Sequence, residues 1–281
     1  MTETLIRVEN ISFSYGATDQ RPVQALRDVS LTIGAGEFLA LIGRNGSGKT
    51  TLAKHLNGLL KPQSGRVLVG DIDTTTVPVG ELARHVGYVF QNPDHQLFLP
   101  TVRQEIAYGP GRLGFGEDEI AQRVDETLDR FGLAGVAERH PAVLGRGLRR
   151  LTALAAIDAM RPKVLVLDEP TGGLDRRFAG RLMDLLTGLA AGGDAIVLIT
   201  HDMRLVAEYA RRVILIRDGQ VAADTTPADM FDQPELLASS GVQSPQVARL
   251  AERLRPHGMP AGICTVDGFV DAYRERTGRS G

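Results

Sequence analysis

The sequence is poor in cysteine and lysine: it contains one cysteine, no tryptophan and 4 lysines among 32 basic residues. The single cysteine, Cys264, excludes an internal disulfide and a metal site built from cysteines alone. No apolar run approaches the roughly 18 residues that a membrane-spanning helix needs. The first ten residues, MTETLIRVEN, lack the apolar core of a signal peptide. We therefore expect the chain to remain in the compartment where it is made.

An excess of charge of either sign is also missing. The 32 basic and 34 acidic residues give a formal net charge of −2, which provides no bulk attraction to nucleic acid or anionic lipid. Three pairs of adjacent arginines have no aromatic residues among them: Arg149–Arg150, Arg176–Arg177 and Arg211–Arg212. We interpret these pairs as solvated faces and expect no nucleic-acid partner.

The 281 residues, 43% of them hydrophobic, are enough to bury a large core. Short apolar runs predict strands at 5–8, 29–33, 38–42, 66–69, 87–90, 164–167, 196–200 and 213–216. Apolar residues at helical spacing predict helices around 120–131, 181–189, 205–211 and 247–254. Short apolar strands that alternate with helices indicate a parallel sheet covered on both faces.

The strongest motif is a phosphate-binding loop. Residues 43–50 read GRNGSGKT and fit G-x-x-x-x-G-K-[ST], after an apolar run at 38–42 and before an amphipathic stretch with leucines at 52, 56, 59 and 60. In such a loop, backbone N–H groups and a helix N-terminus face the phosphates. Lys49 places a positive charge on the outer phosphates, and the Thr50 hydroxyl can bind Mg²⁺. The predicted nucleotide-binding residues here are Gly43, Arg44, Asn45, Gly46, Ser47, Gly48, Lys49, Thr50 and Thr51.

A second motif brings two carboxylates to a strand end. The apolar run Val164–Leu167 leads directly into Asp168 and Glu169, and parallel sheets bind ligands at the carboxyl ends of their strands. We expect Asp168 to hold Mg²⁺, directly or through water, and Glu169 to polarise the water that attacks the γ-phosphate. Together with the loop, these residues predict hydrolysis of a nucleoside triphosphate.

The order of the motifs resembles the nucleotide-binding subunits of ABC transporters. The matching positions are Tyr15, the 43–50 loop, Gln91, Asp168–Glu169, Asp175 and His201. The resemblance implies an ATPase in which Tyr15 stacks on adenine and Gln91 reaches the Mg²⁺ and the attacking water. It also implies that His201 contacts the γ-phosphate and that the loop around Asp175 communicates between two subunits.

A narrower resemblance lies after the glutamine. The stretch Gln91–Phe98, QNPDHQLF, followed by Thr101-Val102 and Tyr108-Gly109-Pro110, is similar to the ATPases of energy-coupling factor (ECF) transporters. This resemblance implies a groove near Gln91–Phe98 that receives the coupling helix of a transmembrane protein. It also implies a separate membrane protein that binds the substrate, and a peripheral location on the cytoplasmic face of the cell membrane.

The resemblance also implies an architecture. We expect an α/β P-loop NTPase core of RecA-like type, with an N-terminal antiparallel β subdomain and a helical subdomain inserted at about 92–160. The ATP-binding domain is expected at 1–219, and a small C-terminal extension at 220–281 is expected to help two ATPase subunits pair.

One segment departs from the family pattern. The family signature reads approximately LSGGQ, whereas residues 144–148, Leu144–Leu148, read LGRGL. In the family this segment clamps the γ-phosphate of ATP bound to the other subunit. Loss of a hydrogen bond to a charged group costs about 1.5–3 kcal/mol. We therefore expect a heterodimer with a related ATPase that carries a complete signature, because a homodimer would have two weak sites.

Two other classes remain as alternatives. A soluble ABC-type ATPase of DNA repair or translation would carry long coiled coils or two fused domains, whereas this chain has one phosphate loop and no sustained heptads. A small-molecule P-loop kinase would not explain Gln91 and His201 together with the ECF-like stretch. The transported substrate and the preference for ATP over GTP stay open.

Overall fold

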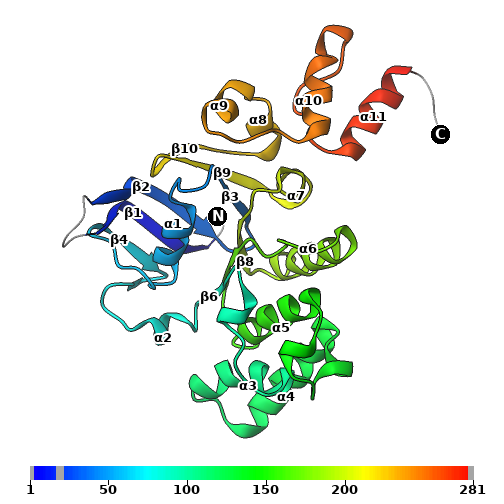
Figure 1. The fold of residues 1–281 in the computed structure, drawn as a ribbon. Helices are drawn as coiled ribbons and strands as arrows, with labels where there is room; N and C mark the ends of the chain where they lie inside the picture. The colour runs from blue at the N-terminus through cyan, green and yellow to red at the C-terminus, as the bar shows by residue number, and fades with distance from the viewer. Residues whose placement is uncertain (1–2, 17–21, 278–281) are drawn as a thin grey trace.

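The structure is a computed structural model that describes residues 3–16 and 22–277. It contains a four-stranded sheet of order β2-β1-β4-β5 and a six-stranded sheet of order β10-β9-β3-β8-β7-β6 (Figure 1). The strands are β1 (Thr4–Tyr15), β2 (Val23–Gly34), β3 (Phe38–Ile42), β4 (Ser64–Val69), β5 (Ile72–Asp73), β6 (Val86–Val89), β7 (Val164–Asp168), β8 (Ala195–Ile199), β9 (Arg212–Arg217) and β10 (Gln220–Thr225).

The helices follow the order of the chain from blue to red in Figure 1. The α-helices are α1 (Lys49–Leu56), α2 (Val79–Leu82), α3 (Val102–Arg112), α4 (Glu117–Phe131), α5 (Arg146–Asp158), α6 (Arg176–Ala191), α7 (Met203–Tyr209), α8 (Pro227–Phe231), α9 (Pro234–Ser239), α10 (Gln246–Arg253) and α11 (Val266–Thr277).

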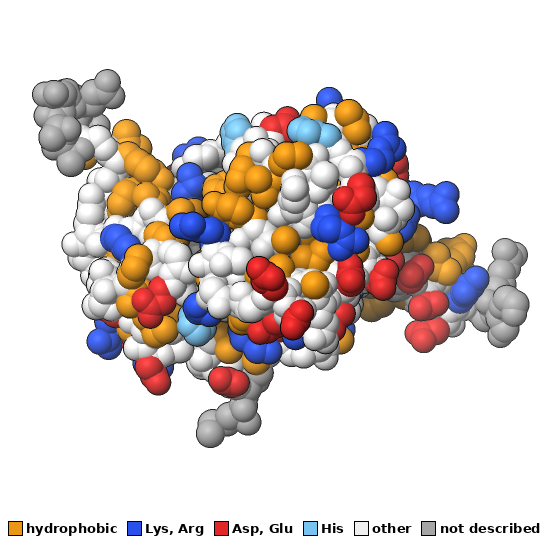
Figure 2. Space-filling view, turned by 90° about the horizontal axis from the view of Figure 1, so that it is seen from below, with side chains coloured by type: hydrophobic (Ala, Val, Ile, Leu, Met, Phe, Trp, Pro, Cys, Tyr) orange, Lys and Arg blue, Asp and Glu red, His pale blue; other side chains and the backbone are white. Residues whose placement is uncertain are grey.

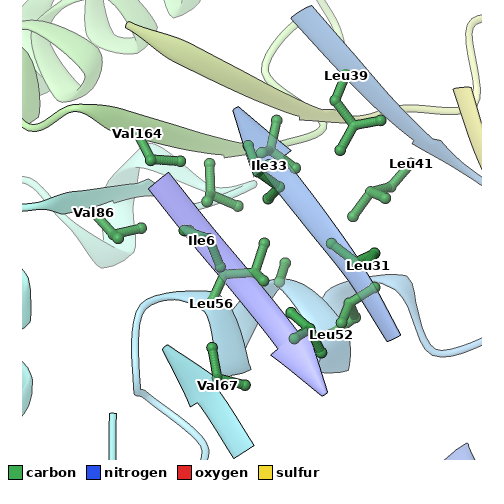
Figure 3. Packing of buried hydrophobic residues seen from close by; sticks show 14 of the residues in the cluster. Ile6, Leu31, Ile33, Leu39, Leu41, Leu52, Leu56, Val67, Val86 and Val164 are labelled. Carbon is green, nitrogen blue, oxygen red and sulfur yellow. The ribbon is translucent and has the colours of Figure 1, made fainter. Parts of the chain in front are cut away.

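The four-stranded sheet is antiparallel and packs against the larger sheet and α1. Residues of β1 and β2, such as Ile6 and Ile33, share one buried cluster with Leu39 of β3 and Leu52 of α1 (Figure 3). β1 and β2 are longer than the predicted strands, because their pairing continues beyond the apolar runs into half-buried residues. The antiparallel β subdomain expected at the N-terminus is therefore present, and it supports the helix that follows the phosphate loop.

The six-stranded sheet forms the centre of the fold. Strands β9, β3, β8, β7 and β6 run parallel, and β10 pairs antiparallel with β9 at the edge. Every residue of β3, β7 and β8 is buried, as expected for a parallel sheet covered on both faces. Because the five parallel strands share one direction, the loops that follow β3, β6, β7 and β8 all begin at the same edge.

Three helices form the insertion between β6 and β7. α3 packs against α4 and α5, and the three lie on the opposite side of the larger sheet from the C-terminal helices α10 and α11 (Figure 1). Val124, Leu128 and Phe131 of α4 are buried, which confirms the predicted helical face. The mixed α/β fold with an antiparallel sheet and a helical insertion is thus confirmed.

The helix after the phosphate loop is shorter than predicted. α1 ends at Leu56, so Leu59 and Leu60 do not continue its apolar face, and Leu59 is exposed. Gly58 follows with φ of +73°, and a Cβ there would lie 2.4 Å from a side-chain carbon of Leu82. This left-handed position, which favours glycine, turns the chain away from the helix axis.

The C-terminal part packs onto the edge of the larger sheet. Met230, Phe231 and Leu237 are buried in a cluster that also contains Ala40 and Ile42 of β3. The domain boundary at 219–220 stays a prediction. β9 lies before this boundary and β10 lies after it, and the two strands are hydrogen-bonded to each other. Residues 278–281, the end of the expected extension, lie outside the described residues.

Candidate functional site

The phosphate loop connects β3 to α1, and two of its glycines lie in close contact with the backbone of neighbouring strands. Gly43 has φ of +144°, and a Cβ there would lie 2.2 Å from the carbonyl oxygen of Ile216. Gly48 has φ of +110°, and a Cβ there would lie 2.6 Å from the carbonyl oxygen of Ala25. Neither position accepts a side chain, so two of the motif's glycines are required by backbone conformation and by close contact with neighbouring strands.

The loop has the features that a phosphate group needs. The Ser47 hydroxyl is buried and has no hydrogen-bond partner among the described residues. Gly46 has φ of +78°, and a Cβ there would meet nothing within 4 Å, so the loop is open on this side. A buried hydroxyl without a partner beside open backbone and the N-terminus of α1 fits an anion with several acceptor oxygens.

Lys49 lies inside the same loop. Its Nζ donates to the carbonyl oxygens of Gly43 at 2.7 Å and Arg44 at 2.9 Å. Burial lowers the pKa of Lys49, and the nearby carboxylates of Glu169 and Asp168 act in the opposite direction. The buried ammonium group therefore faces both the loop and the acidic residues at the end of β7.

Asp168 is the meeting point of three elements. Its Oδ2 accepts a hydrogen bond from the Thr50 hydroxyl at 3.1 Å and one from the Tyr88 hydroxyl at 3.2 Å. Burial and the Asp168 carboxylate raise the pKa of Tyr88, so its hydroxyl stays protonated and donates. No cluster of three or more His, Cys, Asp or Glu side chains suited to a metal occurs in residues 3–16 and 22–277. The oxygens of Thr50 and Asp168 suit Mg²⁺, which commonly takes only one or two protein ligands and completes its shell with phosphates and water.

Glu169 follows at the end of β7. It has φ of +49°, and its Oε1 lies 2.9 Å from His201 Nδ1, at the end of β8. The Glu169 side chain is 14% exposed, whereas that of His201 is 80% exposed. This contact thus joins a sheltered carboxylate to an imidazole that opens to solvent on the same sheet edge.

Tyr15 stands at the end of β1, close to the loop. It is 44% exposed, and its hydroxyl oxygen lies 3.2 Å from Thr51 Oγ1. The Phe13 ring meets the Tyr15 ring edge-on, with centroids 4.9 Å apart. The ring is therefore held through its hydroxyl and by Phe13 while much of it stays exposed, which leaves ring surface for stacking with a base.

Not all predicted residues converge. Gln91 is exposed and lines a cleft of about 460 Å³ with arginines of α5 and with Gly172, rather than contacting Asp168 or Thr50. The Arg44 side chain bonds Asp218 at 2.8 Å on the surface. Asp175 accepts a hydrogen bond from the Phe178 amide at 2.8 Å and caps α6. Hydrogen bonds and side-chain contacts thus connect Lys49 to the loop, Thr50 to Asp168, Thr51 to Tyr15 and Glu169 to His201, whereas the bonds described for Arg44 and Asp175 lead to other residues. The roles predicted for all of these residues stay predictions.

Two side chains in this region were missed by the sequence analysis. Tyr88 was missed because nothing in one sequence shows that β6 pairs with β7, although its place in the apolar run before Gln91 was visible. Arg150 belongs to a pair interpreted as a solvated face, and that interpretation is wrong for Arg149 and Arg150. Arg150 is half-buried and donates to the carbonyl oxygens of Glu169 and Gly172, at 3.1 and 3.2 Å.

The same interpretation is also wrong for Arg212. Its guanidinium bonds the carboxylates of Asp224 and Glu37, the closest contact with Asp224 being 2.6 Å. Burial and these partners explain the error, because the sequence does not show that this arginine meets carboxylates of β10 and of the segment before β3.

The signature segment forms the start of α5. Gly145 is the N-cap, makes no side-chain cap, and a Cβ there would meet nothing within 4 Å. A Cβ at Gly147 would lie 2.7 Å from the Phe178 ring. Arg146 is exposed at the first helical position. A side chain at Gly147 would thus displace the half-buried Phe178 ring, whereas the position that carries serine in the family motif is open.

Comparison with known proteins identifies the family of this chain. Residues 26–172 match the sequence model of the family described as ABC transporter. The chain belongs to the ABC transporter family. It is 39% identical over 261 residues to the energy-coupling factor transporter ATP-binding protein EcfA of Methanothermobacter thermautotrophicus, with 92% of this chain and 83% of that protein covered. The expected resemblance to ECF ATPases is thereby confirmed.

A second relative is longer. The chain is 43% identical over 252 residues to a putative ABC transporter ATP-binding protein of Caldanaerobacter subterraneus subsp. tengcongensis. The match covers 90% of this chain and 44% of that protein, so the chain spans less than half the length of this relative.

Among solved structures, the fold is similar to that of cbiO1 from Clostridium perfringens, part of the ABC transporter complex cbiONQ. The TM-score is 0.75 at 34% identity, and the match covers 89% of this chain and 99% of that chain. Among the helices in residues 3–16 and 22–277, none has the length and apolar character needed to cross a bilayer.

Proposed function

We propose that this chain is the ATP-binding and ATP-hydrolysing subunit of an ECF-type ABC importer. One observation carries the proposal: the elements of a phosphate site and of a hydrolytic site share one edge of the sheet, with Thr50 bonded to Asp168 at 3.1 Å and Glu169 paired with His201 at 2.9 Å. The similarity to EcfA and cbiO1 supports the transporter assignment over a soluble ATPase.

In this function the loop holds the triphosphate. The N–H groups of residues 43–50 and the Lys49 ammonium neutralise the phosphate oxygens, and Ser47 donates its hydroxyl to one of them. Tyr15 stacks on the base by the face that Phe13 leaves accessible. The buried position of Lys49 strengthens its attraction to phosphate, since fewer waters compete for the charge.

Thr50 and Asp168 are the protein residues that would hold Mg²⁺. The ion would neutralise negative charge on the transferred phosphate and orient it. Tyr88 holds the Asp168 carboxylate in place through its hydrogen bond at 3.2 Å. Gln91 is proposed to reach the Mg²⁺ and the attacking water; it follows β6, which pairs with β7, and it lines the cleft beside α5.

Glu169 is proposed as the general base. Its carboxylate takes a proton from the attacking water, while His201 orients the carboxylate through their contact and faces the γ-phosphate. The exposure of His201 at the sheet edge leaves the imidazole free to contact substrate. ATP hydrolysis then yields ADP and phosphate.

A groove beside the 91–98 loop (Gln91–Phe98) is proposed to receive a coupling helix of the transmembrane partner. Phe98 is 62% and Tyr108 46% exposed, and their rings meet edge-on at 5.0 Å. They line a cavity of about 390 Å³ together with apolar residues that include Leu113, Ile157 and Met160. Figure 2 views the molecule from the α3 and α4 end, where hydrophobic side chains gather among charged ones. The groove supports contact with an amphipathic helix, and the chain would then lie peripherally on the cytoplasmic face of the membrane.

The degenerate signature supports a heterodimer. Gly145 offers no hydroxyl, and Arg146 replaces a glycine at the first turn of α5. The partner would be a related ATPase with a complete signature, which gives one strong composite site around this chain's ATP and one weak site. The C-terminal residues 220–281 are proposed to help the two subunits pair.

ATPase assays test this proposal. The chain alone is expected to hydrolyse ATP slowly and to accelerate when mixed with a related ATPase that carries a complete signature. Equal turnover alone and in the mixture would contradict the asymmetric pair. Absence of ATP binding to the chain would contradict the function itself.

A further inference from the structure

Two neighbouring arginines of α5 contact two different loops. Arg149 Nη1 lies 2.8 Å from Asp94 Oδ1, in the 91–98 loop. Arg150 bonds the carbonyl oxygens of Glu169 and Gly172, which begin and end the tight turn after β7, here called the Glu169 turn (169–172). Both arginines line the cleft of about 460 Å³ that also contains Gln91. One helical turn therefore touches both the loop beside the proposed docking groove and the residue proposed as general base.

The Glu169 turn needs external support. Glu169 has φ of +49°, in the left-handed region that non-glycine residues rarely adopt, at a cost of about 1–2 kcal/mol. Its carbonyl oxygen accepts from the Gly172 amide at 3.2 Å and from Arg150 at 3.1 Å. A strained residue keeps its conformation only when its surroundings determine it fully. Within the part of the chain that the structure describes, Arg150 is the only side chain that bonds this carbonyl.

The Arg150 guanidinium is well suited to support the Glu169 turn. It is planar and presents several N–H groups in a fixed fork, so it can bond two carbonyl oxygens at once, whereas a lysine ammonium is a point charge. Arg150 is half-buried, and burial lowers its pKa, although arginine stays charged in proteins. The reduced access of water strengthens both hydrogen bonds.

The 91–98 loop is tied to the same helix twice. Besides the Arg149–Asp94 pair, Gln96 Nε2 donates to the carbonyl oxygen of Ala153 at 2.6 Å, one turn further along α5. Gln96 Oε1 accepts from the Phe90 amide at 3.3 Å, at the end of β6. The first turns of α5 therefore either resist a displacement of this loop or move with it.

We propose that Arg150 is a positioning residue that sets the orientation of Glu169, and that Arg149 connects the same helical turn to the 91–98 loop, so that α5 couples docking of the membrane partner to the general base. In Figure 1, α5 lies between the larger sheet and the helices α3 and α4, which is the place such a connection needs. The inference rests on the proposed function and adds the residues that would couple docking of the membrane partner to the general base.

The first experiment separates positioning from binding. Arg150→Met keeps an unbranched, flexible stem and removes the guanidinium with both hydrogen bonds, and it is expected to lower ATP turnover about ten-fold with ATP affinity within two-fold of the wild type. Arg150→Lys is expected to recover part of the turnover. The control Arg139→Met removes an exposed guanidinium and leaves both quantities unchanged. Wild-type turnover in Arg150→Met, or an equal loss of affinity and turnover, would overturn the inference.

The second experiment does not depend on hydrolysis. Hydrogen–deuterium exchange of the peptide that covers 169–173 is expected to accelerate in Arg150→Met and not in Arg139→Met. Unchanged exchange would overturn the inference even if the chain proved to be no ATPase. Conversely, a wild type that binds no ATP would contradict the proposed function and leave the exchange result valid.

A double-mutant cycle tests the connection between the loops. Asp94 and Arg150 share no bond, and the contacts between them run through Arg149 and α5. In the complex with the membrane partner, turnover losses in Asp94→Asn and Arg150→Met are expected to be non-additive. Additive losses would overturn the coupling between the loops.

Discussion

The phosphate loop and the signature segment are both glycine-rich starts of helices, yet they differ in what their residues can still do. In the loop, Gly43 and Gly48 adopt left-handed or crowded conformations that exclude any side chain. At the signature, Gly145 is extended and open, and Arg146 replaces a small residue. In the proposed function, the loop therefore keeps the complete set of groups for this chain's own nucleotide, and the signature lacks part of the set that it would offer to a partner's nucleotide.

On the proposed function, the two regions separate the binding of this chain's own ATP from the contribution that this chain makes to a partner's ATP site. The residues around the loop converge on Asp168 and Glu169 through bonds inside the chain. The signature has no such internal anchor for a ligand, since in the family its target lies on another subunit. Mutations in the first region should therefore affect this chain's site, and mutations in the second should affect the site of the partner.

The largest effect is expected at the general base. Glu169→Gln removes the proton acceptor and should lower ATP turnover by at least about 100-fold, with ATP binding retained and a closed dimer that traps ATP. Measured turnover and filter binding of labelled ATP check this outcome. The control Glu235→Gln changes a residue of α9 and should leave turnover unchanged; wild-type hydrolysis by Glu169→Gln would show that another group accepts the proton.

A smaller effect is expected for the loop lysine. Lys49→Ala removes the buried charge that faces the phosphates, and ATP affinity should fall about 10- to 100-fold, as expected for a lost charge-assisted contact. Titration with a fluorescent ATP analogue measures this change. Lys163→Ala is the matched control, because the Lys163 ammonium lies 3.6 Å from Asp194 at the surface. Unchanged affinity in Lys49→Ala would contradict the assignment of the loop.

Repair of the signature sharpens the contrast between the regions. The double variant Gly145→Ser/Arg146→Gly restores a hydroxyl and a close backbone approach at an open N-cap. ATP turnover of the chain alone should rise about ten-fold, because each homodimer site regains a hydrogen bond to phosphate.

The matched variant Gly145→Ala/Arg146→Gly lacks only the hydroxyl, and its ATP turnover should rise less. If the two double variants hydrolyse ATP equally fast, the serine hydroxyl is not the missing group.

The smallest effect concerns pH and the helix behind the loop. His55 of α1 is fully buried, its Nδ1 lies 2.7 Å from the carbonyl oxygen of Thr51, and burial lowers its pKa. A histidine with a lowered folded-state pKa contributes stability above its unfolded pKa of about 6.5 and loses it as pH falls further. The midpoint of urea unfolding should therefore decrease between pH 7 and 5, and less so in His55→Gln. An identical pH dependence in both proteins would assign the acid sensitivity to other groups.

The sequence predicted the parts of the site that are contiguous. The loop 43–50 lies where its pattern and the preceding apolar run predicted, and Asp168 and Glu169 follow β7 as predicted. The roles assigned to these residues stay predictions that the variants above test. Leu59 and Leu60 were wrongly added to the helix after the loop, because a helical spacing does not show that Gly58 turns the chain first.

The sequence by itself determined the α/β class, the phosphate loop and the family, because each depends on local spacing and on the order of motifs along the chain. Only the tertiary structure decided that Tyr88 bonds Asp168 and that Arg150 supports the Glu169 turn. The first contact crosses the β6–β7 pairing, and the second joins α5 to the end of β7. Such partners are selected by strand order and helix packing, which no local pattern encodes.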